Sequence, residues 1–149
     1  MPQLPSNRDN APDSTAYFLT KLNSAIITHT DSVLTEFVNK NYADFKKSPE
    51  GFWYKIFSAQ KSERLNRKDS AQVRYHLYLL DNEAVKSETF IARFGKKEMT
   101  TGLESGLLLL AGGDSAVFVV PYYLAFGAKG DGKKIPPFAS VIYHVVVDL

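Results

Sequence analysis

From residue 51 onward the apolar residues of this chain recur at every second position, which is the period of a β-strand. The clearest case is the stretch 73–79, where apolar side chains alternate with Arg74, His76 and Tyr78. Further strands are predicted over 52–57, 90–94, 116–120 and 140–148. Between them, "TTGLESGLLLL" is predicted to form a single short helix. Strands in tandem, without crossover helices between them, favour an antiparallel sheet packed on that helix, an α+β fold.

Before residue 51 the apolar residues follow the period of a helix. They recur three or four positions apart between residues 14 and 47, and the β-branched, polar stretch "IITHTDS" interrupts them. We therefore predict two helices, the second capped by Asp31 or Ser32, followed by a turn at 48–51. Their apolar stripes are expected to pack on the rest of the chain, which favours a monomer, with pairing of two copies as the alternative.

The first residues have a different character. Residues 2–13 are polar, contain proline and show no periodicity, as expected for a flexible tether. The predicted organisation is therefore a tether over 1–13, a helical segment over 14–50 and a sheet domain over 51–149.

The composition excludes several classes of protein. The 149 residues, 44% of them apolar, suffice for one domain with a real core, and no apolar run approaches the ~20 residues of a membrane helix. The net charge is +2, and the basic residues lie close to acidic ones, so no nucleic-acid surface is expected. There is no cysteine, which excludes disulfides, thiol nucleophiles and cysteine-bound metals within this sequence.

The loop "AFGAKGDGKKIPPFA" has part of the pattern of a nucleotide-binding P-loop. A P-loop needs Ser or Thr after its Lys and must open a helix, whose N-terminus faces the phosphates. Here Lys134 stands at the Ser/Thr position, and Pro136 and Pro137 force the following chain into an extended form. No nucleotide is therefore expected.

Catalytic and metal-binding motifs are also missing from the sequence. His29, His76 and His144 lie in separate predicted elements, so spacing places no two of them as joint metal ligands. Ser105 directly precedes Gly106, which differs from the Gly-x-Ser-x-Gly pattern of a nucleophile elbow. No metal or cofactor is expected, and the abundant aromatic and aliphatic residues favour an apolar groove for a peptide or small molecule.

Several features follow one another in a fixed order over residues 102–149. They are Gly102, Glu104, Gly106, Gly113, Pro121, Leu124-Ala125-Phe126-Gly127, Ile135-Pro136-Pro137 and Ala139. In this order they resemble the C-terminal half of FKBP-type peptidyl-prolyl cis–trans isomerases, and the likeness extends more weakly through Gly95 and Tyr75 to Phe52. The resemblance implies a curved antiparallel sheet packed on one short helix.

The same resemblance gives the glycine-rich loop a role. In FKBP-like domains the segment before the last strand overhangs the ligand pocket, so residues 127–137 are expected to form a flap. Gly102, Gly106 and Gly127 are expected to occupy tight backbone sites.

The N-terminal half resembles secreted bacterial members of this family. The stretch "FVNKNYADFKK" followed by "SPEGFWYKI" resembles the entry into the FKBP domain of those members. "YLLDNEAVKSE", together with the loop Lys129-Gly130-Asp131-Gly132, is most similar to the gliding-motility-associated FKBP-like lipoproteins. That likeness implies a periplasmic or cell-envelope location and a lipid anchor on a cysteine in whose place Met1 stands here.

The resemblance also implies the activity and its residues. Such proteins rotate X–Pro bonds in an apolar pocket that binds proline-containing segments and uses no cofactor. The backbone N–H of Thr100 is an expected donor to bound peptide. The implied catalytic positions are Tyr75, Leu103, Phe126 and Tyr143, and the implied substrate-binding positions are Val85, Lys86, Phe90, Met99, Thr100 and Ile135.

Four of these positions differ from the commonest residues of the family. Leu103 stands where an indole is usual, Val85-Lys86 replaces a Phe-Asp pair, and Phe126 lacks the hydroxyl of a Tyr. A weak prolyl isomerase that helps exported proteins to fold is therefore the first hypothesis. A non-catalytic peptide- or protein-binding module and a structural assembly component are the alternatives.

Overall fold

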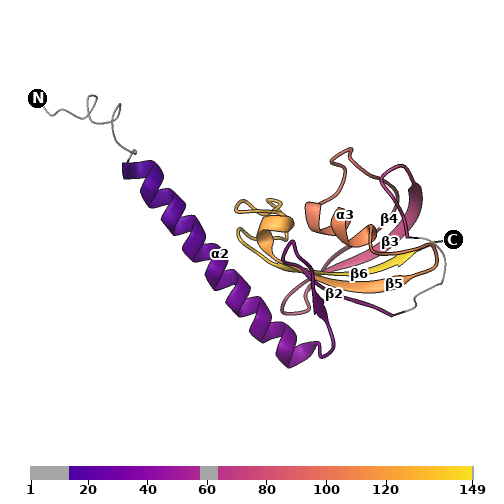
Figure 1. The fold of residues 1–149 in the computed structure, drawn as a ribbon, viewed down its shortest axis with the longest axis horizontal. Helices are drawn as coiled ribbons and strands as arrows, with labels where there is room; N and C mark the ends of the chain where they lie inside the picture. The colour runs from indigo at the N-terminus through magenta and orange to yellow at the C-terminus, as the bar shows by residue number, and fades with distance from the viewer. Residues whose placement is uncertain (1–13, 58–63, 149) are drawn as a thin grey trace, which may run out of the picture.

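The computed structural model describes residues 14–57 and 64–148, so the predicted tether over 1–13 lies outside the described part. A long helix leads into a sheet domain that contains one short helix (Figure 1). The elements are α2 (Ser14–Asn41), β1 (Lys46–Lys47), β2 (Trp53–Ile56), β3 (Ser70–Leu79), β4 (Ala84–Arg93), α3 (Thr101–Leu107), β5 (Ser115–Val120), the 3-10 turn η1 (Tyr122–Leu124) and β6 (Val141–Val147).

The strands form one six-stranded sheet in the order β1-β2-β5-β6-β3-β4, and every neighbouring pair is antiparallel. Helix α3 lies across one face of this sheet (Figure 1). Its Leu103 and Leu107 are buried against inward-facing residues such as Phe118 and Val145. The predicted antiparallel sheet packed on one short helix is therefore present.

The N-terminal segment differs from the prediction of two helices. It is one continuous helix of 28 residues, and the "IITHTDS" stretch does not interrupt it. β-Branched residues lower helix propensity only slightly, and Thr35 returns a hydrogen bond from its hydroxyl to the Asp31 carbonyl at 2.8 Å. Asp31 caps nothing, because its carboxylate accepts a hydrogen bond from the Tyr123 hydroxyl at 2.7 Å. Asp31, predicted as a helix N-cap, therefore makes a tertiary contact with Tyr123 instead.

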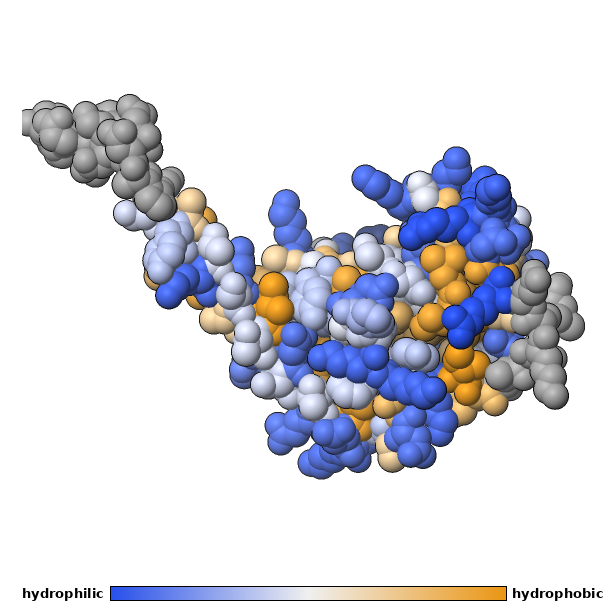
Figure 2. All heavy atoms as spheres, viewed as in Figure 1, coloured by the Kyte–Doolittle hydropathy of each residue, from blue (hydrophilic) through white to orange (hydrophobic). Residues whose placement is uncertain are grey.

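The two halves of α2 have different surroundings. In the second half, Leu34 and Val38 are buried against Val117, Val119 and Ile142, on the face of the sheet opposite to α3. The first half extends beyond the sheet domain (Figures 1 and 2), and its large apolar side chains are exposed. No helix in the described part of the chain has both the length and the apolarity needed to cross a bilayer. The exposed residues of the first half include Tyr17, Phe18, Leu19 and Leu22.

The predicted turn at 48–51 joins β1 to β2 and does not end the helix. Ser48 is buried, and its hydroxyl accepts hydrogen bonds from the N–H groups of Gly51 and Phe52 at 3.2 and 3.1 Å. Because β1 begins at Lys46, the sheet starts five residues before the predicted domain boundary.

Candidate functional site

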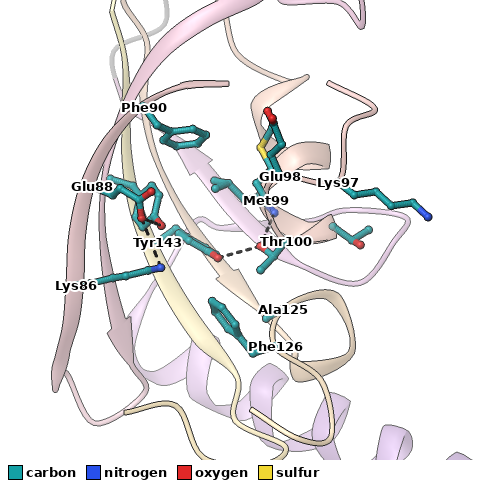
Figure 3. Close-up of a pocket in the computed structure, with 13 residues that line it drawn as sticks. Lys86, Glu88, Phe90, Lys97, Glu98, Met99, Thr100, Ala125, Phe126 and Tyr143 are labelled. Carbon is teal, nitrogen blue, oxygen red and sulfur yellow. Dashed lines mark hydrogen bonds and ion pairs between the residues drawn. The ribbon is translucent and has the colours of Figure 1, made fainter. Parts of the chain in front are cut away.

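A cavity of about 430 Å³ opens between strands β3 and β4, helix α3 and the segment after η1 (Figure 3). Strand β6 contributes Tyr143 to it, so residues far apart in the sequence meet there. Its lining residues are Tyr75, Lys86, Glu88, Phe90, Lys97, Glu98, Met99, Thr100, Thr101, Leu103, Ala125, Phe126 and Tyr143.

All four predicted catalytic positions and most predicted binding positions lie in this lining. Two predicted binding residues do not. Val85 lies beside a register irregularity of β4 and packs at the edge of the core, and Ile135 is 1% exposed within the core. Their contribution to binding stays a prediction. The predicted residues that line the cavity are Tyr75, Lys86, Phe90, Met99, Thr100, Leu103, Phe126 and Tyr143.

Five other lining residues were not predicted as site residues from the sequence: Glu88, Lys97, Glu98, Thr101 and Ala125. For Glu88 the alternation of side chains along the strand could have indicated a place in the site. Side chains alternate along a strand, so residue 88 lies on the same face as Lys86 and Phe90. The period alone could not tell which face of β4 meets the cavity.

Three aromatic rings form the inner wall of the cavity. The Tyr75 ring packs edge-on against Phe90 and Tyr143, with ring centroids 5.8 and 5.3 Å apart. Leu103, 1% exposed, forms the apolar floor, and Phe126 stands across from this wall (Figure 3). The inner side of the cavity is therefore aromatic and aliphatic, while charged residues such as Lys86 and Glu88 also line it.

Thr100 connects helix α3 to the aromatic wall. It precedes the first residue of the helix, and its hydroxyl oxygen accepts the N–H of Leu103 at 3.4 Å, as an N-cap does. The same oxygen lies 2.9 Å from the Tyr143 hydroxyl. The backbone N–H of Thr100 has no hydrogen-bond partner among the described residues, which leaves it available to a ligand.

Burial of Tyr143 has a consequence for stability at high pH. Loss of solvent raises the pKa of its hydroxyl to about 12, against the ordinary value of about 10. Between these values the unfolded chain loses the proton while the folded chain keeps it. We therefore expect the free energy of unfolding to fall by about 1.4 kcal/mol per pH unit from this group as the pH rises from 10 to 12.

Urea denaturation at pH 9, 10 and 11 measures this dependence. Tyr143→Phe should show a smaller loss of stability between pH 10 and 11 than the parent protein. The remaining slope includes contributions from Tyr42, Tyr75 and Tyr123, whose pKa values burial also raises. An unchanged slope in Tyr143→Phe would contradict the assignment.

The wall contributed by β4 carries a hydrogen-bond acceptor, although Lys86 stands where the family usually has Asp. Oε2 of Glu88 accepts the Tyr75 hydroxyl at 2.9 Å and lies 3.5 Å from Nζ of Lys86. Burial first, and this bond second, raise the pKa of Tyr75 well above its usual value. The acceptor expected at position 86 is therefore supplied two residues further along the same face.

The predicted flap is a series of tight turns between η1 and β6. Gly130 has φ +70°, and an added Cβ would lie 2.2 Å from the Ile135 carbonyl oxygen. The Asp131 carboxylate accepts the N–H groups of Lys133 and Ile135 at 2.8 and 2.9 Å, which lowers its pKa. These N–H groups are thus used within the loop, and the buried Ile135 side chain holds the loop to the core.

The site is a shaped cavity with an aromatic inner wall and charged residues in its lining. Within residues 14–57 and 64–148, no three His, Cys, Asp or Glu side chains gather as they would around a metal ion. What the cavity provides is an apolar interior, fixed hydroxyl groups and one free backbone donor.

The chain is similar in sequence to known proteins. The profile of the family described as FKBP-type peptidyl-prolyl cis-trans isomerase matches residues 61–148. A probable FKBP-type peptidyl-prolyl cis-trans isomerase of Haemophilus influenzae is 30% identical over 107 residues, which are 70% of this chain and 44% of that protein. Human peptidyl-prolyl cis-trans isomerase FKBP10 is 35% identical over 86 residues, 53% of this chain. The match spans 15% of the length of FKBP10.

Solved structures agree on the fold. A peptidyl-prolyl cis-trans isomerase of Pseudomonas syringae superimposes with a TM-score of 0.71 at 18% identity, over 85% of this chain and 93% of that one. FkpA from Escherichia coli gives a TM-score of 0.70 at 21% identity, over 98% of this chain and 68% of that one. The predicted α+β fold is confirmed. With most of its sheet domain matched by the family profile, this chain belongs to the FKBP-type peptidyl-prolyl cis-trans isomerase family.

Proposed function

We propose that this chain is a peptidyl-prolyl cis-trans isomerase that acts on X–Pro bonds of exported proteins and helps them to fold. The observation that carries the proposal is the aromatic cavity. Tyr75, Phe90 and Tyr143 form its wall above the Leu103 floor, within the part of the chain that matches the family.

The cavity suits the physical problem of prolyl isomerisation. An X–Pro bond rotates slowly because the twisted transition state loses amide resonance, a barrier of about 20 kcal/mol. The twisted amide has less charge separation than the planar one, so removal of water by apolar walls favours the twisted form. The free N–H of Thr100 would hold a peptide carbonyl while the bond turns. This mechanism needs no nucleophile.

We further propose that the activity is low compared with other members of the family. Leu103 covers less of a proline ring than an indole would, and Phe126 has no hydroxyl to hold a peptide carbonyl. The same two features favour the second candidate function, a module that binds proline-containing segments without catalysing isomerisation of their X–Pro bonds. Catalysis separates the two.

The deciding measurement is the isomerisation rate of a labelled tetrapeptide with a central X–Pro bond, followed together with peptide binding. We expect catalysis above the uncatalysed rate. Phe126→Ala should lower kcat/KM about tenfold or more, because it removes one apolar side of the cavity. Phe57→Ala, which removes an exposed ring outside the cavity, is the matched control and should leave kcat/KM unchanged.

Three outcomes are informative. Catalysis lost in Phe126→Ala and kept in Phe57→Ala supports the isomerase. If the peptide binds but its X–Pro bond isomerises only at the uncatalysed rate, the binding module replaces the isomerase as the proposed function. Absence of both binding and catalysis would reject both functions.

We also propose a cell-envelope location, with the domain carried on a lipid anchor as in the gliding-motility-associated lipoproteins. The support is the resemblance of "SPEGFWYKI" to secreted bacterial members of the family, and of "YLLDNEAVKSE" with the Lys129-Gly130-Asp131-Gly132 loop to those lipoproteins. The first half of helix α2, about 20 Å long, extends beyond the sheet domain and would hold it away from a membrane surface. Fractionation of cells that express the native gene tests this. Recovery in the cytoplasmic fraction would contradict it.

A further inference from the structure

The β4 wall of the cavity places a cation beside the presumed path of a peptide. Lys86 and Glu88 both line the cavity, and each keeps 47% of its side chain exposed. One carboxylate oxygen of Glu88 is shared between the Tyr75 hydroxyl and the Lys86 ammonium. That shared oxygen holds the tyrosine ring and the lysine side chain in position.

Most other polar side chains around the cavity are already paired. The hydroxyl of Tyr75 is bound to Glu88, and that of Tyr143 lies 2.9 Å from the Thr100 hydroxyl. An ammonium group has three N–H donors, and the contact with Glu88 uses one of those on Lys86. Figure 3 shows Lys86 extending from its strand toward the space between Tyr143 and Phe126, whereas Lys97 extends away from the cavity. The free donors of Lys86 therefore face an incoming ligand.

One carboxylate at the opening is held by a cation from outside the lining. Arg93 holds Glu98 through two hydrogen bonds, of 2.8 and 3.2 Å. Within the described part of the chain, Lys97 forms no ion pair. The lining itself holds two cations, Lys86 and Lys97, and two carboxylates, Glu88 and Glu98, so its charges balance in number, and pairing of Glu98 with Arg93 leaves the lysines to meet a ligand.

We propose that Lys86 determines specificity, by favouring X–Pro segments that carry Asp or Glu directly beside the proline. The inference rests on the proposed function, since it takes the proline ring to lie on Leu103 and Phe126. A neighbouring residue then lies along the β4 wall, where its carboxylate reaches the free donors of Lys86. A basic residue at that place meets an ammonium group and binds less well.

The test is a peptide series that differs in charge but not in shape. Labelled peptides with Glu, Gln or Lys before the proline, and with Glu or Gln after it, are titrated at low and at moderate salt. In one of the two positions we expect Glu to bind about 3- to 10-fold more tightly than Gln, and this ratio to shrink as salt rises. Lys86→Met should reduce the ratio to below twofold while the Gln peptide keeps its affinity, and Lys86→Arg should keep the ratio.

Lys46→Met is the matched control, since it removes the same charge at the opposite edge of the sheet. It should retain the preference for Glu. A parent protein that binds Glu and Gln peptides equally would overturn the inference while the proposed function stands. Equal weakening of all peptides in Lys86→Met would make Lys86 a general backbone donor, and loss of the preference in Lys46→Met would make it an effect of net charge. If no peptide binds, the proposed function fails and the inference fails with it.

Discussion

Gly106→Val is expected to lower the free energy of unfolding by about 2–4 kcal/mol. A Cβ at position 106 would lie 2.7–2.9 Å from three ring carbons of Phe118, a distance that real Cβ atoms do not adopt. Phe118 cannot move aside, because it is fully buried and packs edge-on against Phe52 with centroids 5.7 Å apart. The helix must therefore lift from the sheet or the core must repack. Urea denaturation of the parent and the variant measures the difference.

Two glycines extend this comparison. Gly102→Val should have a similar effect, since its Cβ would lie 2.5 Å from Val120 and 3.0 Å from the Leu124 carbonyl oxygen. Gly127→Val should cost only about 1 kcal/mol, because its surroundings are open and the strain comes from φ +73° alone. Equal effects at all three positions would mean that contact with the sheet is not what requires glycine in α3.

Leu103→Trp is expected to raise the affinity for an X–Pro peptide by about tenfold, more than Phe126→Tyr does. Leucine buries less area than the 150–250 Å² typical of large aromatic side chains, and apolar contact contributes about 25 cal/mol per Å². Added contact of this kind corresponds to roughly 1–2 kcal/mol. The cavity of about 430 Å³ beside Leu103 offers space toward which an indole can extend.

The comparison requires both variants to be folded, because Leu103 is 1% exposed and also packs in the core. Circular dichroism and denaturation of each variant provide that control before the titrations. A larger gain in Phe126→Tyr would identify the missing hydroxyl as the limiting feature. No gain in either variant would indicate that proline does not lie on Leu103.

Much of the fold follows from local patterns that tertiary contacts reinforce. The alternation over 73–79 predicts a strand, and β3 lies there because its apolar side faces the core on which α3 packs. The positions of Gly102 and Gly106 likewise indicate that the helix packs closely on its neighbours. In the structure a Cβ at either position would collide with Val120 or Phe118 of the sheet. The predicted break between two helices near Ile27 and Thr28 was wrong. The weak local preference of these residues against helix is overcome because the end of α2 is buried on the sheet.

The sequence by itself determined the antiparallel sheet with its short helix, the family, and eight of the residues that line the cavity. The sheet and helix follow from periodicity within short stretches of chain, whereas the site residues were implied by the resemblance of the motif order to a known family. Only the tertiary structure decided that Glu88, paired across strands with Tyr75, supplies the acceptor of the wall and leaves Lys86 with free donors. Register and side-chain partners depend on which strands meet, and no local pattern contains that information.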